Sequence, residues 1–267
     1  MTCDSVHSVA FSPTGTTRKI VESIAQGIHA GKMECMDLTL PGAHPYTTQI
    51  RQDSLAIFGC PVYAGRLPSV AVNRLRTIRA DGDTPAAIVV VYGNRAYDDA
   101  LLELRDVVQE MGFRPVAAGA FIGEHSYSTQ ANPIAADRPD ADDIQKAVEF
   151  GGMIRIALSG TGFACGTGAL RIPGNFPYRE LRVLQGISPV AQEPLCTRCG
   201  ACVKVCPVAA ISSEHPSSTN ANACIRCCAC IRTCPARARV MADARIRNVA
   251  EQLSSSCGIR KEPEIYL

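Results

Sequence analysis

Residues 5–17 read SVHSVAFSPTGTT, a short strand-forming run that leads directly into a loop of hydroxyl side chains and one glycine. After the loop, Ile20, Ile24 and Ile28 recur on one face of a helix. Backbone N–H groups and hydroxyls at a helix start form an anion site, and glycine lets the backbone approach the anion closely. The residues predicted to form this site are Ser12, Thr14, Gly15, Thr16 and Thr17. A hydroxyl-rich helix start that binds nothing is the alternative.

The same strand-then-helix order continues to about residue 159, which predicts an α/β domain with a doubly wound, parallel, five-stranded sheet. The predicted strands cover residues 5–11, 32–37, 55–59, 86–92 and 116–122. The predicted helices cover residues 17–27, 69–79, 98–112 and 142–158. We also expect a helix at 241–253 and an extended segment at 260–267.

Two later loops follow the third and fourth predicted strands, where a doubly wound sheet places its binding crevice. They read GCPVYAGRLP at 59–68 and YGNRAY at 92–97. Glycines let such loops bend close to a planar ring, and Tyr63 or Tyr97 could stack on that ring. The residues predicted to contact the ring are Pro61, Val62, Tyr63, Ala64, Gly65, Gly93, Asn94, Arg95 and Tyr97. Taken singly, each loop is an ordinary turn.

A cysteine run with the spacing C-x2-C-x2-C-x3-C-P occurs at 196–207 and again at 224–235. In this bacterial ferredoxin pattern three thiolates from one loop hold one [4Fe-4S] cluster, and the fourth cysteine reaches the other cluster. The first predicted ligand set is Cys196, Cys199, Cys202 and Cys234. The second is Cys224, Cys227, Cys230 and Cys206.

Alternatives to two redox-active clusters are a zinc ribbon, which also uses paired C-x2-C elements, and clusters with a purely structural role. Two complete copies with their trailing prolines weigh against zinc. Cys228, beside Cys227, could substitute as a ligand in a shifted register, but only Cys227 keeps the spacing of the first copy.

Basic residues outnumber acidic ones in residues 190–267, ten against six. Arg198, Arg226 and Arg232 lie inside the ligand loops. Positive charge near a cluster raises its reduction potential and would suit an acidic partner. Ordinary solvated arginines are the alternative.

The composition of the 267 residues argues against several functions. With 27 Lys and Arg against 25 Asp and Glu, no net field favours nucleic acid or a membrane surface. The most hydrophobic segment, 86–92, is too short for membrane insertion, and the N-terminus has no secretion signal. We therefore expect a cytoplasmic protein, whose 14 cysteines serve as metal ligands or redox groups rather than disulfides.

The expected domain organisation is an α/β domain at 1–160, a connector at 161–194, a cysteine module at 195–240 and a tail at 241–267. The connector is rich in Gly and Pro but contains three aromatic residues. These favour a segment that packs between the domains over a flexible tether.

The whole chain resembles the flavodoxin–ferredoxin fusion family of anaerobes, sometimes described as EFR-type ferredoxins. The segments that carry the resemblance are 12–17, GCPVYAG at 59–65, YGNRAYDD at 92–99, PGNFPY at 173–178 and RKEPE at 260–264. It implies a flavodoxin-like sheet of strand order 2-1-3-4-5 followed by a small α+β ferredoxin-like domain. It also implies FMN, with its phosphate at the first loop and its ring at the two later loops, and two [4Fe-4S] clusters.

The favoured function is electron relay between the two clusters and FMN in anaerobic metabolism, with redox proteins as donor and acceptor and no catalytic side chain. The alternative is an FMN-dependent reductase of a quinone, nitro compound or corrinoid, with Arg95, His125 and Tyr127 near its substrate. An enclosed pocket with converging polar groups would favour the reductase, and an exposed flavin edge would favour relay. A redox sensor is least favoured, and a homodimer is left open. Cys60, beside a flavin loop, has either a redox role or the ordinary role of a small buried hydrophobe.

Overall fold

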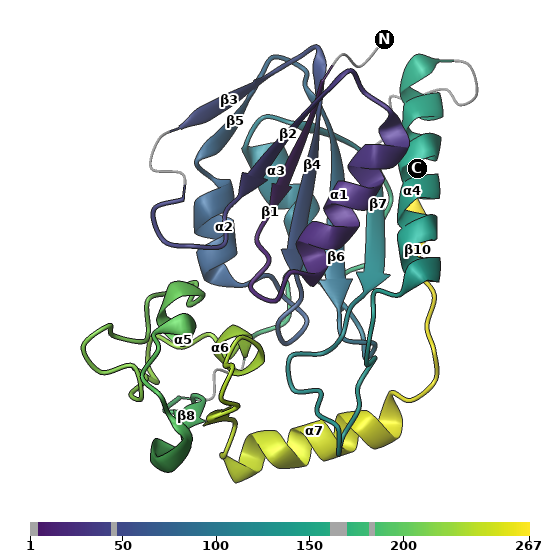
Figure 1. The fold of residues 1–267 in the computed structure, drawn as a ribbon. Helices are drawn as coiled ribbons and strands as arrows, with labels where there is room; N and C mark the ends of the chain where they lie inside the picture. The colour runs from purple at the N-terminus through teal and green to yellow at the C-terminus, as the bar shows by residue number, and fades with distance from the viewer. Residues whose placement is uncertain (1–4, 44–46, 161–169, 182–184) are drawn as a thin grey trace.

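The computed structural model describes residues 5–43, 47–160, 170–181 and 185–267. A six-stranded sheet forms the centre of the α/β domain (Figure 1). Its strands lie in the order β2 (Lys32–Asp37), β1 (Ser5–Ala10), β4 (Ser54–Pro61), β6 (Pro85–Tyr92), β7 (Arg114–Ile122) and β10 (Glu264–Tyr266). The first five are parallel and have the predicted flavodoxin-like order 2-1-3-4-5, whereas β10 runs antiparallel to β7.

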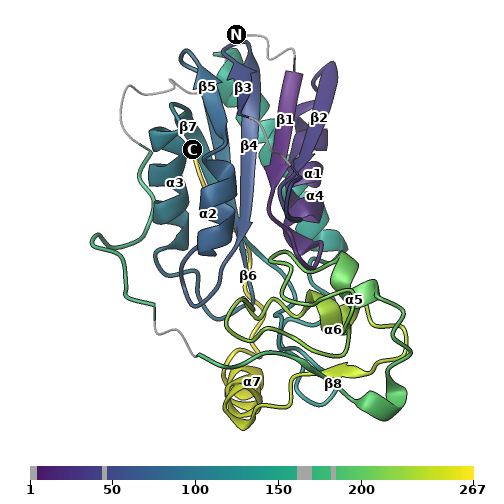
Figure 2. The ribbon, with the colours of Figure 1, turned by 90° about the vertical axis from the view of Figure 1, so that its left-hand side faces the viewer.

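Helices cover both faces of the sheet (Figures 1 and 2). On one face lie α1 (Thr16–Ile28) and α4 (Ala141–Ser159), and on the other lie α2 (Ser69–Leu75) and α3 (Ala100–Glu110). Every residue of β4 and β6 is buried, which explains why these strands read as continuous apolar runs. The backbones of α1 and α4 pack so closely that a Cβ added at Gly151 would lie only 2.1 Å from Ile24 O.

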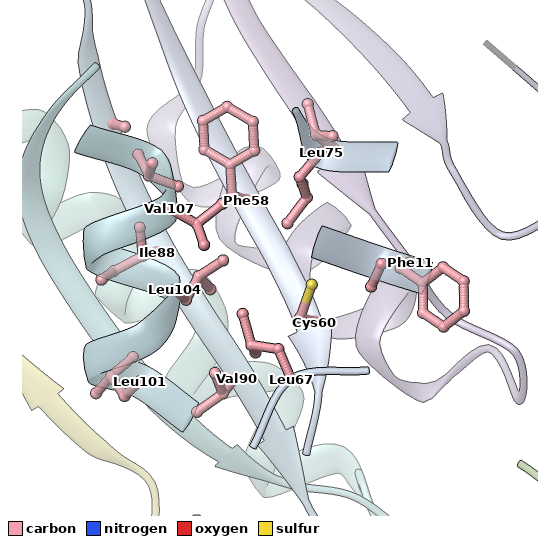
Figure 3. Close-up of a cluster of buried hydrophobic side chains, with 14 of the residues drawn as sticks. Phe11, Phe58, Cys60, Leu67, Leu75, Ile88, Val90, Leu101, Leu104 and Val107 are labelled. Carbon is pink, nitrogen blue, oxygen red and sulfur yellow. The ribbon is translucent and has the colours of Figure 1, made fainter. Parts of the chain in front are cut away.

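Cys60 lies in the apolar core between the sheet and the helices α2 and α3 (Figure 3). Its side chain is fully buried among Leu67, Phe11 and other apolar residues, and burial raises the pKa of its thiol far above the usual value. A thiol in this setting stays protonated and packs as a small hydrophobe.

Two local expectations need correction. The helix predicted at 69–79 ends at Leu75, because Ile78–Asp81 forms β5 and pairs in parallel with β3 (Thr48–Arg51). In addition, the sheet has a sixth strand, since the extended segment at the end of the chain returns to the α/β domain as β10. Both changes come from pairing with strands distant in sequence, which local periodicity does not reveal.

The cysteine module lies beyond the C-terminal ends of the parallel strands (Figure 2). It contains the short helices α5 (Ala201–Lys204) and α6 (Ala229–Arg232), the 3-10 turn η1 (Glu193–Leu195) and an antiparallel pair, β8 (Val190–Ala191) with β9 (Arg239–Val240). Cys202, Ile211 and Cys230 form its small buried centre. This is the small α+β unit that the sequence predicts.

The helix predicted at 241–253 is α7 (Ala244–Ser256). Asp243 caps its N-terminus, because its side chain accepts the N–H of Arg245. It crosses below the sheet before the chain returns to β10 (Figure 1). Asn94 holds the returning segment, because its Nδ2 donates to Cys257 O (2.6 Å) and Ile259 O (2.8 Å). The residues of the predicted tail therefore complete the α/β domain.

The described part of the connector lies along α3. The carboxylate of Asp99 accepts the backbone N–H groups of Asn175 (2.8 Å) and Arg179 (2.7 Å). Arg66 places its guanidinium over the Tyr178 ring at 4.5 Å, while Phe176 remains 78% exposed. Residues 170–181 are thus fixed to the side of the α/β domain rather than enclosed between the two units.

Candidate cofactor sites

The hydroxyl-rich loop joins β1 to α1 at the edge of the sheet where the strand order reverses. Gly15 has φ +85° and directly precedes α1, and a Cβ added there would meet no atom within 4 Å. Ser12 anchors the loop: its N–H donates to Thr39 Oγ1 (2.8 Å), and its hydroxyl accepts the N–H of Arg18 (3.0 Å). The loop therefore has a fixed shape with open space in front of its glycine.

Unused hydrogen-bonding groups remain in this loop. Thr17 Oγ1 is buried, and within the described residues it has no hydrogen-bond partner. Thr14 and Thr16 line the adjoining cavity, with their hydroxyl oxygens 3.5 Å apart. The first N–H groups of a helix also lack intrahelical partners. This set of neutral donors fits a phosphate.

A cavity of about 310 Å³ runs from this loop to the gap between the two units. Such a volume is at the lower end of the range of small-molecule sites, about 300–1,000 Å³. The α/β domain contributes Thr14, Thr16, Pro61, Val62, Tyr63, Ala64, Gly65, Val91, Tyr92, Gly93, Arg95, Ala96, Gly123, Glu124, His125, Ser126 and Tyr127. The cysteine module contributes Ile225 and Arg226, and α7 contributes Ile246, Val249 and Leu253.

The loop after β4 makes a tight turn at the cavity. Ala64 and Gly65 have φ +53° and +83°, and a Cβ at Gly65 would lie 2.1 Å from Asp98 Oδ2. Tyr63 is partly buried at the contact with the cysteine module, near Cys227 and Cys228, and burial raises the pKa of its hydroxyl well above the usual value. Tyr63 therefore lies between the cavity and the second cysteine run.

Two residues predicted to contact the ring make other contacts. Tyr97 is buried beside β10, where its hydroxyl donates to Glu264 Oε2 (2.7 Å) and lies 3.0 Å from the hydroxyl of Tyr266. Asn94 binds the segment after α7, as described above, and Lys261 N–H donates to its Oδ1 (3.3 Å). The C-terminal segment therefore occupies the polar groups that sequence reasoning assigned to a cofactor.

The loop after β7 contributes two residues that were expected at the site only if the protein is a reductase. His125 and Tyr127 both line the cavity, with their rings edge to face at 5.0 Å. The N–H of Tyr127 donates to His125 Nδ1 (3.0 Å). Burial, with the positive charges of Arg232 and Arg95, lowers the pKa of His125 to about 4. At neutral pH this imidazole is therefore uncharged, and its proton lies on Nε2.

Two further cavities lie inside the cysteine module. One is lined by Cys196, Cys199, Cys202 and Cys234, and the other by Cys206, Cys224, Cys227, Cys228 and Cys230. The fourth cysteine of each run thus joins the first three cysteines of the other run. Across the described ranges, no three Cys, His, Asp or Glu side chains gather as the ligands of a single ion. The thiols instead surround a space, which is the arrangement that four separate iron atoms of a cubane require.

Cys228 occupies the position of a glycine in the first run. Cys228 directly precedes α6 with φ +59°, and Gly200 directly precedes α5 with φ +74°. Cys227 therefore corresponds to Cys199, in agreement with the spacing. The sequence already shows this correspondence, because Cys-Gly-Ala-Cys at 199–202 aligns with Cys-Cys-Ala-Cys at 227–230.

Ion pairs and hydrogen bonds fix the cysteine module against the α/β domain. Arg232, in the second run, donates to Glu124 Oε2 (2.7 Å) and to His125 O (3.1 Å). On the other side, Arg74 Nη2 donates to Pro207 O (2.6 Å). These contacts hold the loop of Ile225 against the large cavity.

Comparisons with known proteins match two parts of the chain separately. Residues 188–235 match the family model of a 4Fe-4S dicluster domain, and no curated protein matches the chain. Among solved structures, an archaeal flavodoxin is similar at 13% identity and TM-score 0.37, covering 58% of this chain and 99% of that one.

A WrbA-like flavodoxin from Agrobacterium tumefaciens gives 15% identity and TM-score 0.41, with 58% of this chain and 98% of that one covered. A flavodoxin from Streptococcus pneumonia gives 14% identity and TM-score 0.40, with 58% and 99% covered. The sheet order, rather than these low scores, identifies the first domain. The chain therefore joins an α/β domain with the flavodoxin-like strand order to a segment that matches a 4Fe-4S dicluster domain.

Proposed function

We propose that the chain relays electrons between two [4Fe-4S] clusters and FMN, and so couples one-electron and two-electron redox steps. The observation that carries this proposal is the cavity of about 310 Å³, because one wall comes from the flavin loops and another from Ile225 and Arg226, between two proposed cluster ligands. A route from cluster to flavin would then lie within a single chain, over the width of a few side chains.

The proposed ligands of the first cluster are Cys196, Cys199, Cys202 and Cys234, and those of the second are Cys206, Cys224, Cys227 and Cys230. The FMN phosphate would accept hydrogen bonds from the loop of Ser12, Thr14, Gly15, Thr16 and Thr17. The clusters supply single-electron chemistry, and the flavin exchanges one or two electrons. The side chains of this protein bind, orient and shield these groups.

Relay is favoured over reduction of a small molecule by the cluster-binding loop in the cavity wall and by the properties of His125, since enclosure of the cavity would itself favour a reductase. Ile246, Val249 and Leu253 of α7 cover it, and the module covers another side. Its volume is about 310 Å³, and it shares Tyr63, Ala64, Ile225 and Arg226 with a neighbouring cavity of about 680 Å³, so volume does not separate the two functions. His125, with its pKa lowered to about 4, does not release or return a proton near neutral pH.

Anaerobic purification with iron, sulfide and flavin quantified, followed by stepwise reduction with dithionite, tests the proposal. We expect about eight iron atoms and one FMN per chain, with electrons exchanging between the clusters and the flavin. Tightly bound zinc without sulfide would refute the cluster assignment. Absence of flavin after reconstitution would refute the FMN site.

The reductase alternative is supported by one observation, the convergence of Arg95, His125 and Tyr127 on the cavity. It predicts that the reduced protein is reoxidised by a quinone or nitro compound with saturable kinetics, and that His125→Gln lowers this rate. The relay predicts a slow reaction without saturation, and fast reoxidation only by a redox protein.

A further inference from the structure

Arg239 is a buried charge beside both cysteine cavities. It lies in β9 with 3% of its surface exposed. Its side chain lines the cavity of Cys196, Cys199, Cys202 and Cys234. It also lies near the second set, because two of its hydrogen-bond partners, Thr219 and Pro189, line the cavity of Cys206, Cys224, Cys227 and Cys230.

The partners of this guanidinium are all neutral. Nη1 donates to Thr219 Oγ1 (2.7 Å) and Pro189 O (3.4 Å), while Nη2 donates to the carbonyls of Pro216 and Ser218. Nε is buried and has no hydrogen-bond partner among the described residues. No carboxylate in the described part of the chain forms an ion pair with Arg239.

A second arginine that is buried within the described residues shows what is missing around Arg239. Arg138 is 7% exposed, and its guanidinium binds both carboxylate oxygens of Asp143, which is itself fully buried. Removing a guanidinium from water is costly unless a negative charge lies close by. Arg239 has lost its water and has no carboxylate, so its surroundings lack an anion.

The cysteine cavities can supply that anion. An oxidised cubane with four thiolate ligands carries about two negative charges, and hydrogen bonds to its sulfur atoms raise its reduction potential. We propose that Arg239 is the buried counter-charge of the two clusters and that its Nε–H donates to a sulfur atom of the cluster held by Cys196, Cys199, Cys202 and Cys234. Its charge favours the more negative, reduced form of each cluster. The inference rests on the proposed function only in requiring the clusters.

The arginines inside the ligand loops are less suited to this role. The side chain of Arg198 is 71% exposed, so water and salt screen its charge. Arg232 is engaged by Glu124. Arg239 combines burial, contact with a cysteine cavity and an unused N–H group.

The test is an EPR-monitored redox titration of the anaerobically purified full chain, wild type against Arg239→Gln. We expect Arg239→Gln to keep its iron and sulfide while the reduced-to-oxidised ratio of the first cluster falls at least tenfold at fixed potential, a downward shift of about 59 mV. The second cluster should shift in the same direction by less. The matched control is Arg237→Gln, which removes the same charge from an exposed side chain two positions away and should leave both potentials near wild type.

An Arg239→Gln protein with full cluster content and unchanged potentials would overturn the inference. Should Arg239→Gln fail to hold its clusters, Arg239→Lys decides, because it keeps the charge but removes the Nε–H group. A lowered potential of the first cluster in Arg239→Lys supports the hydrogen bond, and a wild-type potential refutes it. The cluster potentials are measured by EPR whether or not electrons reach the flavin. Failure of the relay would instead appear in the wild-type protein as clusters that do not exchange electrons with the flavin.

Discussion

The two cysteine runs have the same spacing but lie in different surroundings. In the first run Cys199 is exposed, and the neighbouring Leu195 is 51% exposed. In the second run Cys227, Cys228 and Cys230 are all buried. The spacing specifies which thiols come together, whereas the fold decides which site meets solvent and which meets the large cavity.

This difference in exposure predicts that electrons enter the chain at the first site and pass through the second site to the flavin. A cluster in the first site would lie where an external redox protein can approach it. A cluster in the second site would lie behind Ile225 and Tyr63, next to the proposed flavin. The contrast between the two sites can be tested experimentally, beginning with the variant that should have the largest effect.

The largest effect is expected from Cys227→Ala. Removing this thiol should abolish the second cluster, leave about four iron atoms per chain and stop reduction of the flavin through the clusters. Iron analysis and stopped-flow flavin absorbance measure both effects. The matched control, Cys228→Ala, should retain about eight iron atoms, because Cys228 occupies a glycine position in the first run. The reverse result would show that the second run binds in a shifted register.

Air should damage the two sites at different rates. We expect the first cluster to decay about tenfold faster than the second, because oxidation of thiolate sites follows their exposure. EPR of samples reduced at intervals after exposure to air, with iron counts, would record the two decays. The Cys227→Ala protein should show the fast decay alone. Equal rates for the two clusters in the wild type would contradict the contrast in burial.

His125 should give the fold a pH dependence on the flavin side of the second site. Its folded-state pKa is lowered to about 4, so between that value and the unfolded value of about 6.5 only the unfolded chain takes up a proton. Stability is therefore complete above about pH 6.5 and falls by roughly 1–2 kcal/mol on going to pH 5. Chemical denaturation at pH 7 and pH 5 measures this loss.

Replacing His125 with Gln should remove most of that pH dependence, whereas replacing the exposed His215 with Gln should leave it intact. If the His125→Gln protein loses the same stability at pH 5 as the wild type, another group is responsible.

The smallest effect is expected from Arg232→Gln, which removes the ion pair to Glu124 across the two units. The pair is partly exposed, so its loss should cost roughly 0.5–1 kcal/mol and slow electron transfer to the flavin about two- to fivefold without loss of iron. Stopped-flow reduction measures the rate. Arg245→Gln, which breaks an ion pair with Asp243 outside the contact, should have no effect on it. A wild-type rate in Arg232→Gln would show that this contact does not position the second site.

Features encoded over a few residues could be predicted from the sequence. The five parallel strands and the loop before α1 follow from local periodicity, and each cysteine run is recognised by its spacing, whereas the crossed grouping of the cysteines comes from the known two-cluster ferredoxin pattern. Of the two roles open to Cys60, the structure supports that of a small buried hydrophobe, which is the common role of a buried thiol.

The features that were missed depend on segments far apart in the chain. Asn94 bonds to the carbonyl of Cys257, 163 residues away, and Tyr97 to Glu264, 167 residues away. The amphipathic pattern of α7 indicated a helix, but not that its apolar face covers the cavity. Nor did composition distinguish the buried Arg239 from the exposed arginines around it. Which surface each group faces is a property of the folded chain.

The return of the chain to β7 has a consequence for how this protein is made and divided. Because β10 follows the cysteine module in the chain, a ribosome completes the module before the sheet receives its last strand. Until then the edge of β7 is open to other chains, a known route to aggregation. A cut between residues 194 and 195 would not yield two self-contained parts, since the first would lack β10 and the fastening of Asn94. The two units are therefore joined both by the covalent chain and by the return of the C-terminal strand to the sheet of the first domain.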